Sequence, residues 1–247
     1  MTWSHSRITT YEDCPYSFYL KYISKEPKER KFFSDFGLLM HKLLQKYLDK
    51  EATPEELVRQ YLTEFRSSVV GRAPNSQIFN NYFHQGLEYL QSLKPMEENI
   101  IGTEQEVNFK IGDKDFVGFI DKLSKDHGIV ITDHKSRALK PRSNRSKPLK
   151  SDLELDKYLR QLYLYSAAVE QIYHKLPKKL VFNCFRTKTQ IEEPFDPEKY
   201  EQAKNWALTA IDKIDKETEW NPNIDEFRCR YLCDVCDHCD YYQLFCH

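Results

Sequence analysis

The stretch that most constrains this chain is a short strand-like run that ends in polar side chains. Residues 128–135 read Gly-Ile-Val-Ile-Thr-Asp-His-Lys, and the alternation predicts a β-strand whose period of two places Asp133 and Lys135 on one face. A second such run, residues 116–121, ends in Asp121 and is followed by the polar turn 124–128. If the two runs pair as a hairpin, Asp121 approaches Asp133.

Two neighbouring carboxylates repel each other unless a cation lies between them, and hard oxygen ligands favour Mg²⁺ or Mn²⁺. A lysine beside such a site can orient or activate the attacking water, so Asp121, Asp133 and Lys135 outline a site for phosphodiester hydrolysis. The alternative is a solvated ion pair between Asp133 and Lys135, which is common at strand ends.

The composition limits the classes of protein. The 247 residues allow one large domain or two small ones, and the net charge of -1 means that any affinity for nucleic acid comes from a local patch. No stretch approaches the roughly 18 apolar residues that a membrane span needs. We therefore expect a soluble, cytoplasmic protein without a membrane partner.

A helix over residues 34–50 has one apolar face that includes His41. A lone histidine there is either a satisfied core residue or a ligand. Gly37, one turn earlier, indicates that another group comes close. Further helices are predicted from a cap at Ser6, from Pro15, from the Thr53–Glu56 capping box and over residues 77–93, and three strands between residues 100 and 133.

Residues 136–150 form a basic segment without any acidic residue. Its basic residues are Arg137, Lys140, Arg142, Arg145, Lys147 and Lys150. Proline and serine exclude a regular element, so we predict a mobile loop directly after the acidic site. It is either an ordinary solvated face or a phosphate-binding segment.

The next predicted helix, residues 151–174, carries Tyr158, Gln161 and Tyr165 on one face. A tyrosine stripe normally packs in a core, but the amide of Gln161 needs a polar partner, such as a backbone or phosphate oxygen. A strand over residues 179–186 and a helix from Pro197 to about Lys216 follow.

Five of the seven cysteines crowd the last nineteen residues. They are Cys229, Cys233, Cys236, Cys239 and Cys246, while Cys14 and Cys184 stand alone. In a reducing compartment such crowding indicates metal or cluster ligation. The spacing leaves zinc and an iron-sulfur cluster both open, and His238 and His247 could also serve as ligands.

Six motifs occur in an order that resembles a known family. They are Ser4-x-Ser6 followed by Cys14-Pro15, Gly37-x-x-x-His41, Gly118-x-Ile120-Asp121, Asp133-x-Lys135, Gln161-x-x-x-Tyr165, and the terminal Cys236, Cys239 and Cys246. The chain resembles, over nearly its whole length, RecB-like nucleases of the PD-(D/E)xK superfamily. The similarity is greatest to the branch with an iron-sulfur cluster, which includes the exonuclease of CRISPR adaptation and the nuclease domains of AddB-type helicase-nucleases.

The resemblance implies an α/β (α+β) fold in which helices flank the central mixed sheet of a restriction-endonuclease-like core. We expect one nuclease domain over residues 1–247. Its parts would be a helical part, 1–95, with Cys14 and His41, a catalytic core, 96–216, and a cysteine-rich tail, 217–247, that packs against the N-terminus.

The resemblance also implies residue roles. His41, Asp121, Asp133 and the His134 carbonyl would hold Mg²⁺ or Mn²⁺, and Lys135 would position the attacking water. Gln161 and Tyr165 would brace the site and touch the nucleic acid. The four ligands of a [4Fe-4S] cluster would be Cys14, Cys236, Cys239 and Cys246. The gap between Cys239 and Cys246 exceeds the family's usual five residues by one, so Cys229 or Cys233 could substitute, and Asp133 replaces the glutamate of many relatives.

The expected function is a metal-dependent deoxyribonuclease, an exonuclease on single-stranded DNA or DNA ends. The chain has no phosphate loop ending in Gly-Lys-Ser or Gly-Lys-Thr, so strand separation would need a helicase, a recombination or CRISPR-type partner, or frayed DNA. Some members of the family form rings, which makes a homo-oligomer an alternative to a monomer. The competing functions are a non-catalytic nucleic-acid-binding subunit and a zinc-binding interaction module.

Overall fold

The computed structural model describes residues 1–95 and 97–245 and contains one mixed sheet. Its strands, in spatial order, are β1 (Ile100–Ile111), β2 (Lys114–Lys125), β3 (Ile129–Lys135), β4 (Lys179–Cys184) and β5 (Thr189–Pro194). Neighbouring strands are antiparallel except β3 and β4, which are parallel. This mixed α/β architecture, with helices around a central sheet, is the fold class that the sequence predicted.

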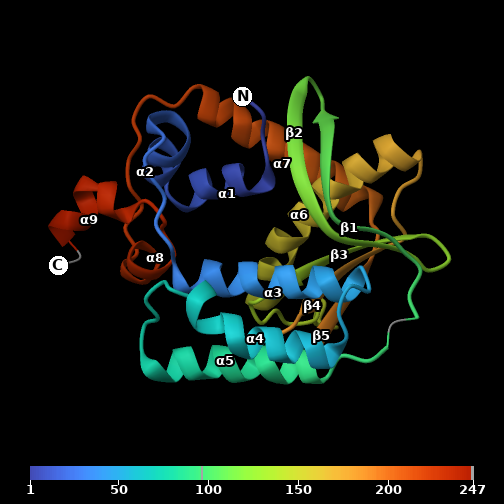
Figure 1. Cartoon of the computed structure of the whole chain (residues 1–247). Coiled ribbons are helices and arrows are strands. Elements are labelled where there is room, and N and C mark those ends of the chain that lie inside the picture. Colours follow the sequence, from blue (N-terminus) through green and yellow to red (C-terminus); the bar gives the residue numbers. More distant parts are fainter. Residues whose placement is uncertain (96, 246–247) are drawn as a thin grey trace.

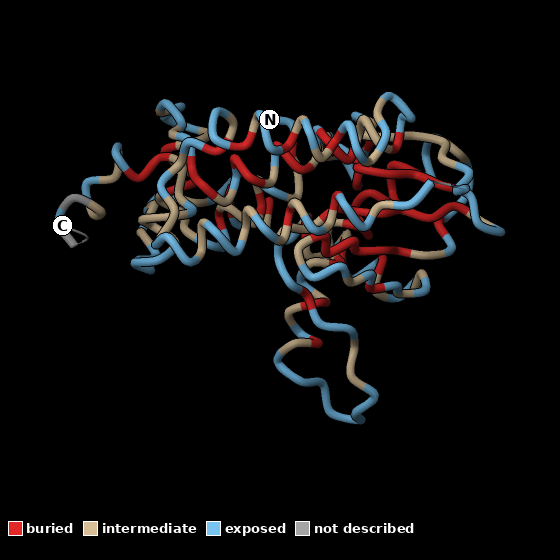
Figure 2. The backbone as a smooth tube through the Cα atoms, turned by 60° about the horizontal axis from the view of Figure 1, so that its bottom comes forward, coloured by how far each residue is buried: buried red, intermediate tan, exposed pale blue. Residues whose placement is uncertain are grey.

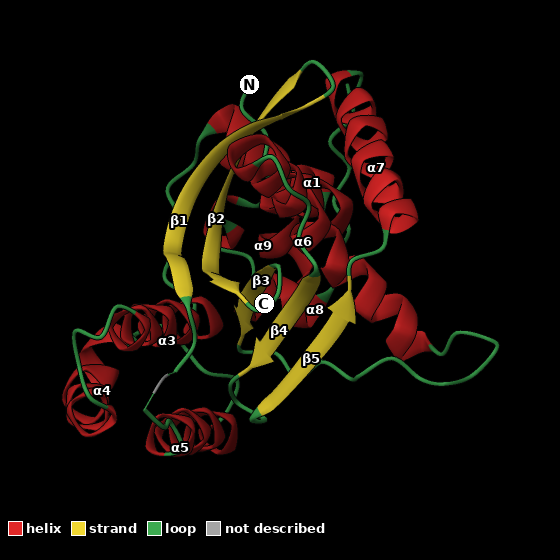
Figure 3. Ribbon diagram, turned by 90° about the vertical axis from the view of Figure 1, so that its right-hand side faces the viewer, coloured by secondary structure: helices red, strands yellow, loops and turns green. Residues whose placement is uncertain are grey.

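Helices pack around this sheet (Figure 1; Figure 3). The first part of the chain forms α1 (His5–Asp13), α2 (Pro15–Phe18), the π-helical turn η1 (Tyr19–Ser24), α3 (Phe32–Leu48), α4 (Pro54–Ser68) and α5 (Ser76–Gln91). The remainder comprises α6 (Lys150–Tyr173), α7 (Pro197–Asp215), α8 (Glu226–Tyr231), η2 (Cys236–His238) and α9 (Asp240–Phe245). Helix α6 makes the crossover between the parallel strands β3 and β4, whereas α3, α4 and α5 pack on one another as a separate group.

The described residues form two hydrophobic cores. One core lies between the sheet, α6, α7 and α1, and the other lies among α3, α4 and α5 and includes Phe185, just after β4. Buried residues follow the strands and the inner faces of the helices (Figure 2). The active-site candidates lie where these two packed units meet, because His41 is on α3 while Asp121 and Asp133 are on the sheet.

Local signals predicted most element ends correctly. The Thr53 hydroxyl accepts the amide hydrogen of Glu56, and the Glu56 carboxylate accepts that of Thr53, which confirms the capping box. The predicted cap of the first helix is wrong by two residues. Ser4 has extended backbone dihedrals and its Oγ accepts the Arg7 amide at 3.2 Å, whereas Ser6 lies inside the helix.

Strand β5 was not predicted from the sequence. Its six residues alternate weakly, and Ile191 is the only one of them that is buried. The strand forms because β4 supplies a complete antiparallel ladder, from Lys179 opposite Pro194 to Cys184 opposite Thr189. An edge strand of this kind depends on its neighbour more than on its own pattern.

A segment near the start of the chain packs against a segment near its end. Trp220 stacks on Phe18 with ring centroids 5.7 Å apart, and Lys21 pairs with Asp234 at 2.5 Å. The Glu29 amide donates to the Asp234 carbonyl at 2.7 Å. Within the described part of the chain, no helix is both long enough and apolar enough to span a membrane.

Candidate active site

Two buried carboxylates from neighbouring strands form the centre of the site. The β2–β3 ladder pairs Lys122 with Thr132, which places Asp121 and Asp133 next to each other, and both side chains are almost fully buried. Asp121 Oδ2 accepts the His134 amide at 2.5 Å. The predicted hairpin is therefore confirmed, and it brings the two acids together.

Lys135 lies on the same side as Asp133, as the period of the strand requires. Its Nζ is 2.8 Å from Asp133 Oδ2 and donates to Gln161 Oε1 at 2.8 Å. Gln161 Nε2 in turn donates to the Tyr165 hydroxyl at 3.0 Å. The polar partners of Gln161 are thus the Lys135 ammonium and the Tyr165 hydroxyl, and not a backbone oxygen. Three side chains from β3 and α6 form one hydrogen-bonded line.

Gly118 allows α6 to approach β2 this closely. A Cβ atom at Gly118 would lie 2.5 Å from Tyr165 Cε1, well inside the contact distance. The glycine of the Gly118-x-Ile120-Asp121 motif therefore has a steric reason: it makes room for the ring that ends the Lys135–Gln161–Tyr165 line.

His41 reaches the acidic pair from α3. Its Nε2 is 3.1 Å from the His134 carbonyl oxygen, and its Nδ1 is 3.2 Å from Glu104 Oε1 and 3.6 Å from Asp121 Oδ1. The histidine on the apolar face of α3 is thus half-buried at the site and not a core residue. Of the three residues whose oxygens lie near the His41 ring, Glu104 on β1 had not been singled out in the sequence.

The charges of the site perturb one another. Burial raises the pKa of Asp121 to about 7, and the charge of Asp133 adds to this. Although burial opposes it, the hydrogen bond to Glu104 and the charges of Asp121 and Asp133 raise the pKa of His41 to about 9. A bound cation would relieve the repulsion between the two crowded carboxylates and so favour their ionised forms.

Comparison with known proteins agrees with this geometry. The family model of the PD-(D/E)XK nuclease superfamily matches residues 2–244, which is almost the whole chain. The chain belongs to the PD-(D/E)XK nuclease superfamily.

A solved structure shares the fold of this PD-(D/E)XK nuclease. A crystal structure from Eubacterium rectale, described as a "putative exonuclease", is 15% identical and has a TM-score of 0.54, with 96% of this chain and 91% of that chain covered. The crystal structure of SSO0001 is 20% identical over 83% of this chain and 95% of its own, but its TM-score of 0.32 is too low for a comparison of folds. Among curated proteins, none matches the chain significantly.

The donor set of this PD-(D/E)XK nuclease fits a hard divalent cation. Nucleases of the superfamily generally use divalent metal ions, and His41, Glu104 and Asp121 offer ligand atoms that all lie within 4.8 Å of one another. Carboxylate and carbonyl oxygens with one imidazole suit Mg²⁺ and Mn²⁺. The nuclease therefore has a site in which such an ion would be well accommodated.

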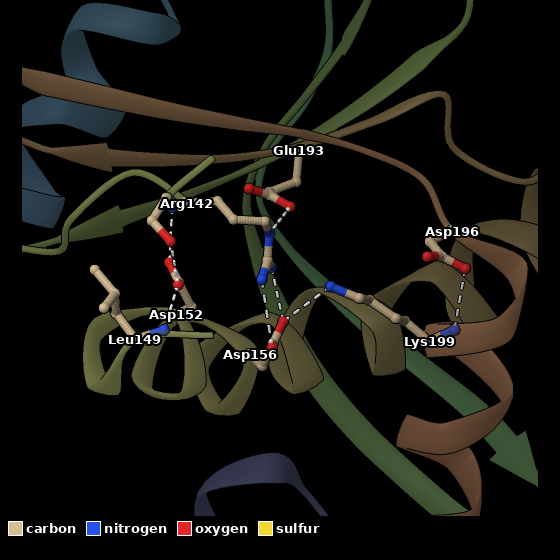
Figure 4. A network of polar contacts seen from close by, with 8 residues as sticks. Arg142, Leu149, Asp152, Asp156, Glu193, Asp196 and Lys199 are labelled. Atoms are coloured by element: carbon tan, nitrogen blue, oxygen red, sulfur yellow. Dashed lines mark hydrogen bonds and ion pairs between the residues drawn. The ribbon is translucent and has the colours of Figure 1, made fainter. Parts of the chain in front are cut away.

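The basic loop contains no acidic residue of its own, but Arg142 pairs with acids from other segments. Its guanidinium pairs with Glu193 at 2.9 Å and with Asp156 at 2.7 Å, and Asp156 also binds Lys199 (Figure 4). The acids come from β5 and α6, so a scan of the loop's own sequence could not show them. Arg142 anchors the loop instead of lying open to a ligand.

A second anchor closes the end of the loop. Asp152 accepts the amides of Ser143 and Leu149 at 2.8 and 2.7 Å and the Ser143 hydroxyl at 2.6 Å (Figure 4). Arg137 pairs with Glu154 at 2.9 Å. Lys140, Arg145 and Lys147 are exposed and have no ion pair among the described residues, so these three cations are available for phosphate.

Gly37 lies at an open part of α3. Apart from its chain neighbours and the backbone of its own helix, no atom of the described residues lies within 4 Å of the position that its Cβ would take. The expected close approach is therefore not made by the described part of the chain. The space that the missing side chain leaves is one helical turn from His41.

The cysteines gather at a separate place, where the tail meets α1 and α2. Cys14, Cys229, Cys233, Cys236 and Cys239 all line one cavity of about 130 Å³. Burial raises the pKa of the Cys239 thiol, and the nearby Cys233 and Cys14 raise it further. Cys246, the fourth predicted cluster ligand, lies outside the described residues. Cys184 is buried in the main core and does not line this cavity.

Proposed function

We propose that this nuclease is a metal-dependent DNA exonuclease that acts on single-stranded DNA or on DNA ends. The observation that carries the proposal is the convergence of His41, Asp121, Asp133 and Lys135 from three elements on one small site. A buried acidic pair beside an ammonium has the composition that phosphodiester hydrolysis needs. Two observations support the exonuclease assignment: the family resemblance and the description of the Eubacterium rectale protein.

In the proposed site, His41, Asp121, Asp133 and the His134 carbonyl hold Mg²⁺ or Mn²⁺. The bound ion supplies Lewis-acid polarisation of the scissile phosphate and neutralises its charge. The protein contributes rigidity: the Asp121 carboxylate is held by the His134 amide at 2.5 Å, so the strand that offers the carbonyl also orients the acid.

Lys135 positions the attacking water. Its ammonium is held between Asp133 and Gln161, each at 2.8 Å, and the charge of Asp133 raises its pKa although burial opposes this. Lys135 therefore stays protonated and acts as a hydrogen-bond donor to water or to the phosphate oxygen. Gln161 and Tyr165 fix its direction and contact the DNA strand.

The basic loop guides the substrate. It follows directly after Lys135, and Lys140, Arg145 and Lys147 project from a segment that is anchored at both ends. Contacts to phosphates make binding sensitive to salt and tolerant of sequence. Because the chain has no helicase motor, a helicase, recombination or CRISPR-type partner would supply single strands.

The function is tested with end-labelled single-stranded, blunt duplex and circular single-stranded DNA, each incubated with Mg²⁺ or Mn²⁺. We expect the linear substrates to be degraded from their ends, the circle to persist, and Asp121→Asn to abolish degradation. Cleavage of the circle would show an endonuclease. Binding without cleavage by the wild type in either metal would favour the alternative, a catalytically silent nucleic-acid-binding subunit.

We also propose a structural [4Fe-4S] cluster that is held by Cys14, Cys236, Cys239 and Cys246, with Cys229 or Cys233 as a substitute ligand. The cavity lined by five cysteines supports it, as do the amides of Ser17 and Asn223, which each lie 3.4 Å from Cys14 Sγ and would stabilise a thiolate. Such a cluster would tie the two chain ends together and contribute folding free energy.

The cluster is tested on protein purified without oxygen. We expect a brown protein that absorbs broadly near about 400 nm, because a zinc protein is colourless: Zn²⁺ has a filled d shell. Cys14→Ser should lose the colour and bound iron, whereas the matched variant Cys184→Ala, in the main core, should keep both. Stoichiometric zinc without iron would overturn the cluster in favour of a zinc site.

A further inference from the structure

Glu104 is a carboxylate that strand β1 turns toward the active site. The β1–β2 ladder pairs Thr103 with Lys122 and Gln105 with Ile120, so Glu104 lies beside Asp121. Its φ of 42° is in the left-handed region, which a residue with a side chain rarely adopts within a strand. The strand keeps this conformation at the one position where its side chain meets His41.

Each ring nitrogen of His41 has its own oxygen partner. Nδ1 is 3.2 Å from Glu104 Oε1, and Nε2 is 3.1 Å from the His134 carbonyl oxygen. Asp121 Oδ1 is 3.6 Å from Nδ1, beyond hydrogen-bond distance, and Asp121 Oδ2 is already bound to the His134 amide. Glu104 is therefore the acceptor for the Nδ1 hydrogen.

This arrangement decides which nitrogen of His41 can bind an ion. An ionised carboxylate only accepts hydrogen bonds, so the nitrogen that faces Glu104 must carry hydrogen. The His134 carbonyl beside Nε2 also only accepts hydrogen bonds, but it is neutral and holds a proton less strongly than the Glu104 carboxylate does. An imidazole that binds an ion must free one nitrogen, so His41 would keep the hydrogen on Nδ1 and offer the lone pair of Nε2. Metal-binding histidines commonly donate their second N–H to a carboxylate, which sets the tautomer and the ring orientation.

We propose that Glu104 is a positioning residue for the metal site: it holds His41 in the Nδ1–H tautomer and directs Nε2 toward the divalent cation. The inference rests on the proposed function, because it assigns a role within the same metal site. It adds to that function a residue that acts through His41: Glu104 lies among the groups that could reach an ion, and the proposal assigns its carboxylate to the Nδ1 hydrogen of His41 instead.

The test measures Mn²⁺ affinity from the electron paramagnetic resonance signal of the unbound ion, with purified protein and no DNA. We expect Glu104→Ala to weaken Mn²⁺ binding about 10- to 100-fold. Glu104→Gln should stay within about threefold of wild type, because its amide oxygen accepts the same hydrogen. Glu106→Ala is the matched control, since Glu106 lies two residues along β1 with an exposed side chain, and its affinity should equal that of wild type.

The outcomes separate the two proposals. Wild-type affinity in Glu104→Ala would overturn the positioning role, and a loss in Glu104→Gln as large as in Glu104→Ala would replace it with direct ligation by the charged carboxylate. Mn²⁺ binding with the expected variant pattern but without DNA cleavage would overturn the exonuclease and leave the role of Glu104 standing. A wild type that binds no Mn²⁺ would overturn both.

Discussion

Lys135, at the end of β3, donates a hydrogen bond of 2.8 Å to Gln161 on α6, which lies 26 positions further along the chain. Gln161 in turn donates to Tyr165 at 3.0 Å, so one amide connects the ammonium to a ring that is wedged against β2 at Gly118. The position of the candidate catalytic lysine therefore depends on how α6 packs on the sheet.

Removing the amide partner should slow cleavage without weakening metal binding. A hydrogen bond to a charged group contributes about 1.5 to 3 kcal/mol, so Gln161→Leu should lower the cleavage rate roughly 10- to 100-fold. Lys135→Met should lower it about 10²- to 10³-fold, in the range of a lost hydrogen-bond donor at a reacting centre. Single-turnover cleavage and Mn²⁺ affinity are measured together, and equal rates in Gln161→Leu and wild type would contradict the positioning of Lys135 by Gln161.

The contact between β2 and α6 can be tested through a single methyl group. Gly118→Ala places a Cβ 2.5 Å from Tyr165 Cε1, and overpacking of this kind should lower the free energy of unfolding by about 1 to 3 kcal/mol. Gly102→Ala on β1 is the control, because its Cβ would meet mainly the flexible end of the Gln105 side chain. Urea unfolding compares the two, and similar stabilities would mean that α6 shifts freely.

Gly37 should respond in the opposite direction. Its Cβ position is open, so Gly37→Ala should raise the stability of α3 by roughly 1 kcal/mol, as alanine does in a helix interior. If DNA passes this face on its way to His41, the bulkier Gly37→Leu should keep the added stability and weaken single-stranded DNA binding. Unchanged DNA affinity in Gly37→Leu would place the substrate elsewhere.

The cations of the basic loop should differ in role: some bind DNA, whereas Arg142 anchors the loop to the protein. Removing Lys140, Arg145 and Lys147 together should reduce the slope of log affinity against log salt by about 2, at roughly 0.7 for each contact to a single strand. Arg142→Ala should leave the slope unchanged but lower the melting temperature, because Glu193 and Asp156 lose their partner. A slope change in Arg142→Ala alone would reverse these assignments.

The anchor at Asp152 makes a prediction about pH. Its hydrogen bonds to the Ser143 hydroxyl and to the Ser143 and Leu149 amides lower the pKa of Asp152 from 3.8 to about 2. A carboxyl with a lowered pKa in the folded state stabilises the protein fully above the unfolded value and loses this effect as pH falls through the folded one. The difference in urea midpoint between wild type and Asp152→Asn should be constant above about pH 4 and shrink toward pH 2.

Local patterns in the sequence were enough to find the centre of the site. The period of two in β3 put Asp133 and Lys135 on one face, and the turn before Gly128 predicted the hairpin that brings Asp121 alongside. The spacing of four on α6 placed Gln161 against Tyr165. These relations follow from the repeat of a single strand or helix, which a sequence carries in the order of its residues.

Contacts between distant segments were decided only by the tertiary structure. Glu104 has no periodic signal, and its meeting with His41 depends on the register of β1 and on the way α3 packs beside it. The partners of Arg142 lie on β5 and α6, and β5 itself forms because β4 offers an unpaired edge. Which residues share a face is set by the local repeat, but which faces meet is set by the packing of the whole chain, because that packing is chosen by the total buried surface and not by any one segment.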